Sequence, residues 1–199
     1  MSPIFESDPV RIPRRLPSPR RFIDDRGWFM ETYSEASAQT AGIDVRFVQD
    51  NHSYSALQGT IRGLHFQRPP HAQAKLVRCV RGAIMDYAVD IRRGSPTYGQ
   101  HLAAKLTAEG GEQFFVPVGF AHAFITLEPD VEVAYKVSDV YAPACDGGIV
   151  WNDPCIAINW PLPRDGAILS HKDKALPTLA EFDSPFEYDG QPLLPLTGA

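Results

Sequence analysis

The stretch KLVRCVRG (75–82), followed directly by AIMDYAVDIRRG (83–94), decides the fold. Apolar residues occupy every odd position of residues 83–91, whereas two carboxylates, Asp86 and Asp90, fall on even positions. A period of two residues is typical of a β-strand with two different faces. The stretch therefore predicts the clearest pair of strands in the chain, with both carboxylates on one face of the second strand.

The rest of the chain is divided in the same way. From Phe22 onward, short apolar runs are interrupted by glycine, proline, asparagine or aspartate about every 8 to 12 residues, the spacing of an all-β sandwich or barrel. Glycine (15) and proline (18) are frequent, which favours turns over long helices. The pattern predicts further strands over residues 59–66, 99–107, 112–117, 120–127 and 131–138, and short helices near 34–41 and 176–181.

Length and charge limit the possible functions. The 199 residues suffice for one domain, and we expect an extended proline- and arginine-rich arm over 1–21, a folded domain over 22–182 and a tail over 183–199. With 24 acidic and 19 basic residues, the net charge is -5. This balance argues against nucleic acid as a partner, but it leaves room for a local basic pocket that binds a phosphate ligand.

Cysteine usage and hydropathy indicate the compartment. Cys79, Cys145 and Cys155 show no C-x-x-C spacing, and their odd number leaves at least one without a partner in the chain. A reducing, intracellular compartment fits best. No stretch approaches the roughly 18 uninterrupted apolar residues of a transmembrane helix, and no apolar core follows the basic N-terminal residues. We therefore expect a cytoplasmic protein with no membrane segment.

Two short motifs carry polar residues that can do chemistry. PVGFAHAF (117–124) places His122 in a P-x-G-x-x-H pattern that resembles the second motif of the cupins, which are double-sheet jelly rolls. A metal-binding cupin also carries H-x-H, because a divalent ion needs about three convergent ligands. This chain has no H-x-H: Gln67 stands where the second histidine is expected after His65. We expect a metal-free barrel whose polar interior serves acid and base chemistry.

The other motif is IRGLHFQ (61–67). It places Arg62 and His65 three residues apart, so on a regular strand the two side chains face opposite sides unless a bulge intervenes. Taken alone, His65 fits a buried, hydrogen-bonded histidine better than a catalytic one.

The middle of the chain, from about residue 22 to 182, resembles the dTDP-4-dehydrorhamnose 3,5-epimerases. Eight blocks occur in order and at family spacing, which is far more specific than any single motif. The blocks are DDRGWFMETY (24–33), FVQDNHSYS (47–55), IRGLHFQRPPHAQAKLVRCVRG (61–82), DYAVDIRRGSPTYGQ (86–100), PVGFAHAF (117–124), EVAYKVSDVYAP (132–143), GIVWNDP (148–154) and ILSHKDK (168–174).

The resemblance implies an all-β, cupin-type double-sheet jelly roll with short peripheral helices, assembled as a homodimer. It implies an enzyme that needs no cofactor and acts on dTDP-4-dehydro-6-deoxy-D-glucose, inverting C3 and C5 to give dTDP-4-dehydro-L-rhamnose. Both carbons adjoin the C4 ketone, so removal of either proton gives an enolate whose charge rests on one oxygen. One base and one acid on opposite faces of the sugar then serve both centres.

The resemblance also implies catalytic roles. His65 resembles the general base, and Asp173 the carboxylate that orients its imidazole. Tyr135 resembles the acid that delivers a proton on the other face. Lys75 resembles the cation that stabilises the developing oxyanion.

For substrate binding, the resemblance implies a second set of residues, spread over the chain. Arginine suits a diphosphate, because its planar fork binds oxygens in pairs, and amides suit the edge of a thymine. Asp146 stands where the family has a glutamate, and Ala74 and Ala123 stand where it has glycines. The set comprises Arg26, Phe29, Glu31, Gln49, Asn51, Arg62, His122, Tyr141, Asp146 and Lys172.

Several alternatives stay open at this point. Tyr135 can be an ordinary strand tyrosine, Lys75 and Arg62 solvated strand residues, and Asp173 a helix cap. Asp86 can support His65 or simply bond the backbone. At the level of function, the alternatives are an epimerase of dTDP-4-keto-6-deoxy sugars that acts at one centre only, and a non-catalytic sugar-nucleotide-binding cupin. The presence of both His65 and Tyr135 argues against the last.

Overall fold

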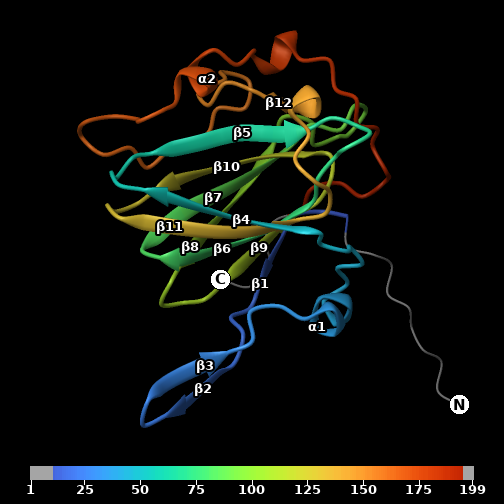
Figure 1. Cartoon of the computed structure of the whole chain (residues 1–199). Coiled ribbons are helices and arrows are strands. Elements are labelled where there is room, and N and C mark those ends of the chain that lie inside the picture. Colours follow the sequence, from blue (N-terminus) through green and yellow to red (C-terminus); the bar gives the residue numbers. More distant parts are fainter. Residues whose placement is uncertain (1–10, 195–199) are drawn as a thin grey trace, which may run out of the picture.

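The computed structural model describes residues 11–194 and contains two five-stranded antiparallel sheets (Figure 1). The first sheet has the order β1 (Arg14–Leu16), β9 (Gln113–Val116), β6 (Lys75–Arg81), β11 (Val131–Val137) and β4 (Gln49–Ser55). The second has the order β12 (Asp146–Gly148), β5 (Ile61–Gln67), β10 (Phe120–Thr126), β7 (Ala83–Asp90) and β8 (His101–Thr107). The all-β class and the double-sheet arrangement are as expected.

The remaining elements are short. A separate hairpin pairs β2 (Arg21–Asp24) with β3 (Gly27–Met30), and α1 (Glu35–Thr40) follows it. Near the C-terminus lie α2 (His171–Lys174) and two single-turn 3-10 helices, Pro143–Cys145 and Leu179–Glu181. Within residues 11–194, no helix has the length and apolar character that crossing a membrane requires.

The two strands of the deciding stretch form as predicted, but they belong to different sheets. β6 pairs with β9 and β11, whereas β7 pairs with β10 and β8. The chain changes sheet at Gly82, which has a φ of 79°. A Cβ there would lie 2.8 Å from side-chain atoms of Glu128 and Val131, so this turn favours glycine for both conformation and space.

The two faces of β7 bury different cores. Ile84 and Ala88 face the space between the sheets, together with side chains of β6, β9 and β11. Tyr87 and Val89 face outward, where the segment after β12 covers them. Asp86, on the inner face, is completely buried among these apolar residues. Such a carboxylate needs polar partners inside the barrel, and these partners define the site described below.

A bulge in β5 resolves the spacing of Arg62 and His65. His65 pairs with His122 of β10, but Arg62 pairs with Phe124. The three-residue interval from Arg62 to His65 on β5 therefore lies opposite a two-residue interval on β10. The extra residue brings Arg62 and His65 to the same face of the strand. At the bulge, Gly63 has a φ of 129°, and a Cβ there would lie 2.4 Å from the Cβ of Ala123.

Both ends of the described chain pack on the barrel. β1, inside the segment expected to be an arm, pairs in register with β9 of the same chain. In the segment expected to be a tail, Phe186 and Leu193 are buried in the two main cores. Buried Arg92 links this segment to the barrel, because its guanidinium bonds both oxygens of Asp90 and also Asp189 at 2.8 Å.

The β2–β3 hairpin extends away from both sheets (Figure 1). It carries four large apolar side chains that are at least half exposed, namely Phe22, Ile23, Trp28 and Phe29. A single two-stranded hairpin is marginally stable in water, and a contiguous exposed apolar patch marks an interaction surface.

We expect Gly63→Ala to destabilise the protein more than Gly27→Ala does. Gly27 has nearly the same φ, 127°, but a Cβ there meets no atom within 4 Å. Gly27→Ala should therefore cost only conformational strain, about 1–3 kcal/mol. Gly63→Ala adds a collision with β10, which should cost about 1–3 kcal/mol more. Urea denaturation of both variants measures the difference, and equal losses would show that β5 and β10 tolerate the extra carbon.

Candidate active site

A cavity of about 490 Å³ opens at one end of the space between the sheets. Its polar wall comprises Arg62 and His65 of β5, Lys75 of β6, His122 of β10 and Tyr135 of β11. A smaller cavity of about 200 Å³ adjoins it and shares His65, Lys75 and Tyr135. The apolar core fills the other end of the barrel, so the two sheets enclose one polar chamber.

His65 and Asp173 form a hydrogen-bonded pair at the wall of the cavity. The Nε2 of His65 lies 2.7 Å from the Oδ1 of Asp173. Asp173 stands in the first turn of α2, where its backbone N–H donates to the capping side chain of Ser170 at 3.0 Å. Burial raises the pKa of the Asp173 carboxyl, but His65, Ser170 and the N–H of Gly63 outweigh it and hold the pKa below its usual value. Asp173 is thus a buried carboxylate anion beside His65.

His122 and Asp86 form a second pair, deeper in the barrel. The Nε2 of His122 lies 2.6 Å from the Oδ1 of Asp86, and both side chains are buried. Burial lowers the pKa of His122, and the nearby charges of Lys75 and His65 lower it further, against the opposing effect of Asp86. The structure therefore answers the question left open for Asp86, which supports His122 and not His65.

Lys75 is a buried ammonium group at the floor of the cavity. Its Nζ donates to the backbone carbonyl of His65 at 3.4 Å. Burial lowers the pKa of Lys75 to about 8, and the carboxylates of Asp86 and Asp146 oppose this shift. The Oδ2 of Asp86 is buried and has no hydrogen-bond partner within residues 11–194. The two charges attract each other across this part of the barrel.

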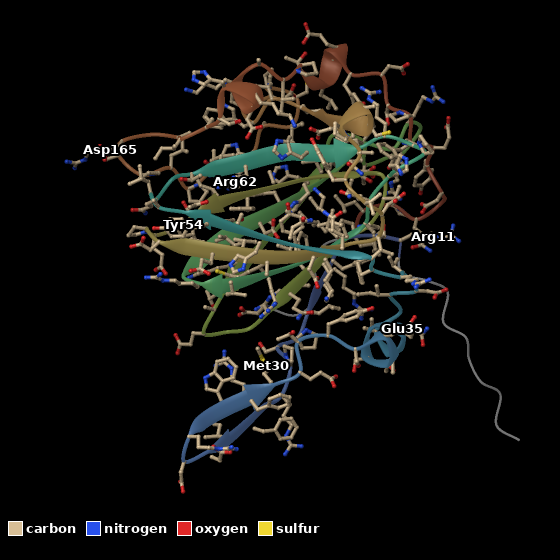
Figure 2. The ribbon with its side chains drawn as sticks, viewed as in Figure 1. Arg11, Met30, Glu35, Tyr54, Arg62 and Asp165 are labelled. Carbon is tan, nitrogen blue, oxygen red and sulfur yellow. The ribbon has the colours of Figure 1, made fainter. Side chains whose placement is uncertain are left out.

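Tyr135 and Arg62 approach the cavity from the two different sheets. Burial raises the pKa of the Tyr135 phenol, although the charge of Arg62 acts in the opposite direction, so Tyr135 keeps its proton at neutral pH. The Nε of Arg62 donates to the hydroxyl of Ser55 at 3.2 Å, and its Nη2 donates to the carbonyl of Tyr54 at 2.9 Å. Figure 2 shows Arg62 at the level of β5, beside Tyr54.

The predicted residues at the mouth of the smaller cavity contact one another. The phenol of Tyr141 donates to the Oδ2 of Asp146 at 3.3 Å, and the ammonium of Lys172 pairs with the same oxygen. Gln49 accepts a hydrogen bond from the backbone N–H of Tyr141 at 3.2 Å, and its Nε2 donates to Asn51 at 2.8 Å. Asp146 therefore reaches Tyr141 and Lys172 although it is one methylene shorter than glutamate.

Three of the predicted binding residues line neither of these two cavities. Arg26 bonds Asp24 at 2.6 Å in the turn of the β2–β3 hairpin, and the ring of Phe29 is 68% exposed on β3. Glu31 lies just beyond β3, within 3.5 Å of the hydroxyl of Ser37. In Figure 2, Met30 at the end of this hairpin is well separated from Arg62. One copy of the chain does not bring these three residues to its own cavity.

Three residues that support the site were not predicted from the sequence. Gly63 carries the bulge, Ser170 caps the helix of Asp173, and Gln67 bonds two loops at the mouth of the cavity. Gly63 had a signal, since a glycine inside a strand suggests a bulge. Ala74 and Ala123 keep a negative φ, so neither substitution of a family glycine strains the backbone. Among residues 11–194, no group of three or more histidine, cysteine or acidic side chains is arranged to hold a metal ion.

The double-sheet jelly roll and its chamber define a class of protein. A buried carboxylate beside one histidine, a neutral tyrosine on the other sheet and a buried lysine between them suit proton transfer to and from carbon next to a carbonyl group. The fold and the site together are those of a cupin-type isomerase.

Comparison with known proteins identifies the family. The family profile described as dTDP-4-dehydrorhamnose 3,5-epimerase matches residues 15–181, and the chain belongs to this family of carbohydrate epimerases. A dTDP-4-dehydrorhamnose 3,5-epimerase from Sinorhizobium fredii is 50% identical over 174 residues, which cover 87% of this chain and 89% of that protein. The chain is accordingly an enzyme.

Solved structures agree with this membership. The dTDP-4-dehydrorhamnose 3,5-epimerase from Bacillus anthracis, with TDP and PPi bound, is 49% identical with a TM-score of 0.79, covering 83% of this chain and 93% of that one. The dTDP-6-deoxy-D-glucose-3,5-epimerase from Legionella pneumophila, in complex with dTDP-4-keto-L-rhamnose, is 39% identical with a TM-score of 0.84, covering 92% and 98%. A 3'-monoepimerase from Streptomyces bikiniensis is 35% identical with a TM-score of 0.77, covering 87% and 88%.

We expect Lys75 to titrate near pH 8 and Asp86→Asn to move its midpoint to lower pH. The carboxylate of Asp86 favours the ammonium form, so its removal leaves burial less opposed. NMR of protein labelled at the lysine side-chain carbons measures the midpoint, and Lys75→Met assigns the signal. A Lys75 midpoint near the ordinary value of 10.5, in either protein, would contradict this description of the chamber.

Proposed function

We propose that the enzyme inverts C3 and C5 of dTDP-4-dehydro-6-deoxy-D-glucose and so forms dTDP-4-dehydro-L-rhamnose for dTDP-rhamnose biosynthesis. One observation carries the proposal: His65, which is paired with Asp173, and Tyr135 line one cavity but stand on different sheets. A sugar ring between them presents one face to a base and the other face to an acid. That is the arrangement that inversion at a carbon requires.

His65 acts as the base in this proposal. A neutral imidazole removes the proton next to the C4 ketone, and the Asp173 carboxylate stabilises the imidazolium that forms. Because Asp173 is held by the cap of α2 and by its bond to His65, the ring is oriented before substrate arrives. Tyr135 then returns a proton on the opposite face of the enolate.

Lys75 stabilises the enolate. The negative charge on the C4 oxygen is the same whether the proton leaves C3 or C5, so one buried cation serves both steps. Attraction between Lys75 and the C4 oxygen is strong in this chamber, because little water screens the charges. His122 stays neutral, and its one N–H, on Nε2, donates to Asp86, so the Nδ1 that remains can only accept a hydrogen bond.

The nucleotide binds toward the mouth. Arg62 and Lys172 supply positive charge for the diphosphate, and Lys172 exchanges part of its contact with Asp146 for phosphate oxygens. Tyr141 offers an exposed ring for stacking, with Gln49 and Asn51 beside it. The TDP and the dTDP-4-keto-L-rhamnose in the Bacillus anthracis and Legionella pneumophila structures support a dTDP-sugar as ligand.

The alternative function is epimerisation at one carbon only. The Streptomyces bikiniensis 3'-monoepimerase shares the fold, so the fold does not separate the two activities. The higher identity to 3,5-epimerases, 50% and 49% against 35%, supports inversion at both centres.

We also propose that the enzyme works as a homodimer in the cytoplasm. The β2–β3 hairpin exposes apolar side chains and carries Arg26 and Phe29 away from the cavity of its own chain. Docking on a second copy covers the apolar side chains and brings both residues to the partner's cavity. The free cysteines Cys79, Cys145 and Cys155 suit a reducing compartment.

Exchange of the sugar protons with solvent deuterium distinguishes the role of the base from that of the acid. We expect His65→Asn to abolish both exchange and turnover, because no enolate forms without the base. We expect Tyr135→Phe to retain exchange while epimerisation falls by about 100-fold or more, because His65 still removes and returns a proton on one face. NMR of dTDP-4-dehydro-6-deoxyglucose in deuterated water follows C3 and C5 in the same sample.

Two outcomes would contradict the proposed roles. Wild-type protein that exchanges neither carbon is not an epimerase of this sugar. Tyr135→Phe protein that epimerises at nearly the wild-type rate would exclude Tyr135 as the acid, and Tyr141 would be the next residue to test.

Mixing two inactive variants tests the dimer. His65→Asn keeps an intact hairpin, whereas the double change Arg26→Ala and Phe29→Ala keeps an intact base. If each cavity uses the hairpin of the other copy, co-expression of equal amounts should restore about a quarter of wild-type activity, since half of the dimers are mixed and each holds one complete site.

The control is each variant expressed alone, with two different affinity tags to prove that mixed dimers form. Mixed dimers without activity would show that the hairpin serves its own chain or neither site. Sedimentation of the wild-type protein as a monomer at assay concentration would exclude the shared site.

A further inference from the structure

The side chain of Gln67, at the end of β5, makes three hydrogen bonds to backbone groups of other segments. It is 3% exposed, lies two residues after His65 on the same face of the strand, and lines the smaller cavity. Its Nε2 donates to the carbonyl of His71 at 2.6 Å and to that of Val140 at 3.1 Å. Its Oε1 accepts from the backbone N–H of Ala142 at 2.8 Å. The whole amide is therefore engaged.

The bonded groups lie on either side of Tyr141. Gln67 holds the carbonyl of Val140 and the N–H of Ala142, and the N–H of Tyr141 itself donates to Gln49. Three consecutive residues are thus fixed by two glutamine side chains. Within residues 11–194, the other bonds of Val140 and Ala142 stay inside the same segment: the N–H of Val140 donates to the Asp139 side chain at 2.7 Å, and the N–H of Cys145 donates to the carbonyl of Ala142 at 2.9 Å.

We propose that Gln67 is a positioning residue that holds Tyr141 over the substrate cavity. This inference rests on the proposed function and extends it, since it assigns a role to a residue that touches no reacting atom. Two donors and one acceptor are needed at once, and a primary amide provides them in one plane. A glutamate of the same shape offers no donor and places a negative charge against two carbonyl oxygens.

The position of Gln67 explains why it can act in this way. A cupin that binds a metal carries the second histidine of its H-x-H motif at this place. Here the side chain at the same strand position bonds the loops at the mouth, whereas His65 and Lys75 line the larger cavity, which Gln67 does not. The strand therefore supplies one residue for the reaction and one for the entrance.

The effect of losing Gln67 should appear in binding and not in proton removal. His65 is oriented by Asp173 from α2, which Gln67 does not contact. Gln67→Met keeps the length of the side chain and removes all three bonds. We expect the KM for the dTDP-sugar and the Kd for dTDP to rise by about 10-fold, the scale of one or two lost hydrogen bonds. Deuterium exchange at saturating substrate should persist.

A double-mutant cycle shows whether Gln67 acts through Tyr141. We expect Tyr141→Ala to raise the KM by a similar factor, and the double variant Gln67→Met/Tyr141→Ala to be no worse than either single one. Faster hydrogen exchange of the Ala142 N–H in Gln67→Met is a direct sign that the loop is released. Gln67→Glu provides a second test, because it keeps the acceptor for Ala142 but loses both donors.

Ser184→Ala is the matched control. Ser184 is also buried, and its hydroxyl also makes two backbone bonds, donating to Ile91 and accepting from Phe186. It holds a segment that lines neither cavity, so we expect its loss to lower stability without raising the Kd for dTDP.

The inference is wrong if Gln67→Met and Gln67→Glu leave both constants within about twofold of wild type, or if the effects of Gln67→Met and Tyr141→Ala add in the double variant. It is also wrong if Ser184→Ala raises the Kd for dTDP as much as Gln67→Met does. Failure of the proposed function looks different, because the wild-type protein would then exchange neither carbon while dTDP binding still reports on Gln67.

Discussion

The close approach of β5 and β10 at Gly63 determines which side chains reach the cavity. Side chains alternate along a regular strand, so Arg62 and His65 would face opposite sides, and Ile61 and Leu64 would do the same. The bulge moves both apolar residues into the outer core and both polar residues into the chamber. Backbone contact with Ala123 leaves no room for a side chain at the bulge, and the N–H of Gly63 also supports the Asp173 carboxylate. One backbone irregularity therefore shapes the core and the site together.

The two histidine–aspartate pairs have similar geometry but differ in surroundings. His122 and Asp86 are deeply buried in the barrel, where burial favours the neutral imidazole. His65 is partly open to the cavity, and its partner Asp173 remains charged beneath it. A base must be able to gain a proton while it contacts substrate. The buried surroundings of His122 oppose this, whereas those of His65 do not. The environment, and not the residue type, separates a histidine that can cycle its proton from one that holds a fixed hydrogen bond.

Much of the fold could be predicted, because strand alternation is a local property. Six of the seven predicted strands form within one or two residues of their expected ends, and β7 ends at Asp90, four residues before the predicted end at 94. β4 was missed since its sequence, QDNHSYS, is polar: it is an edge strand whose side chains line the cavity and face solvent. That 75–82 and 83–94 lie in different sheets depends on Gly82 and on contacts far apart in sequence. The partner of Asp86 was equally hidden, because 36 residues separate it from His122.

The polar end of the barrel explains why the site residues come as pairs. A buried polar group without a partner costs free energy, so each group inside a jelly roll must be satisfied by another side chain, by backbone or by ligand. His65, His122 and Gln67 all find partners within the chain. Lys75 and the Oδ2 of Asp86 remain less satisfied, and both belong to the floor where the negative charge of the enolate would develop. A cation that is incompletely bonded by the chain keeps hydrogen-bonding capacity for that oxygen, so in the proposed mechanism the buried groups that lack full bonding are the ones that stabilise the intermediate.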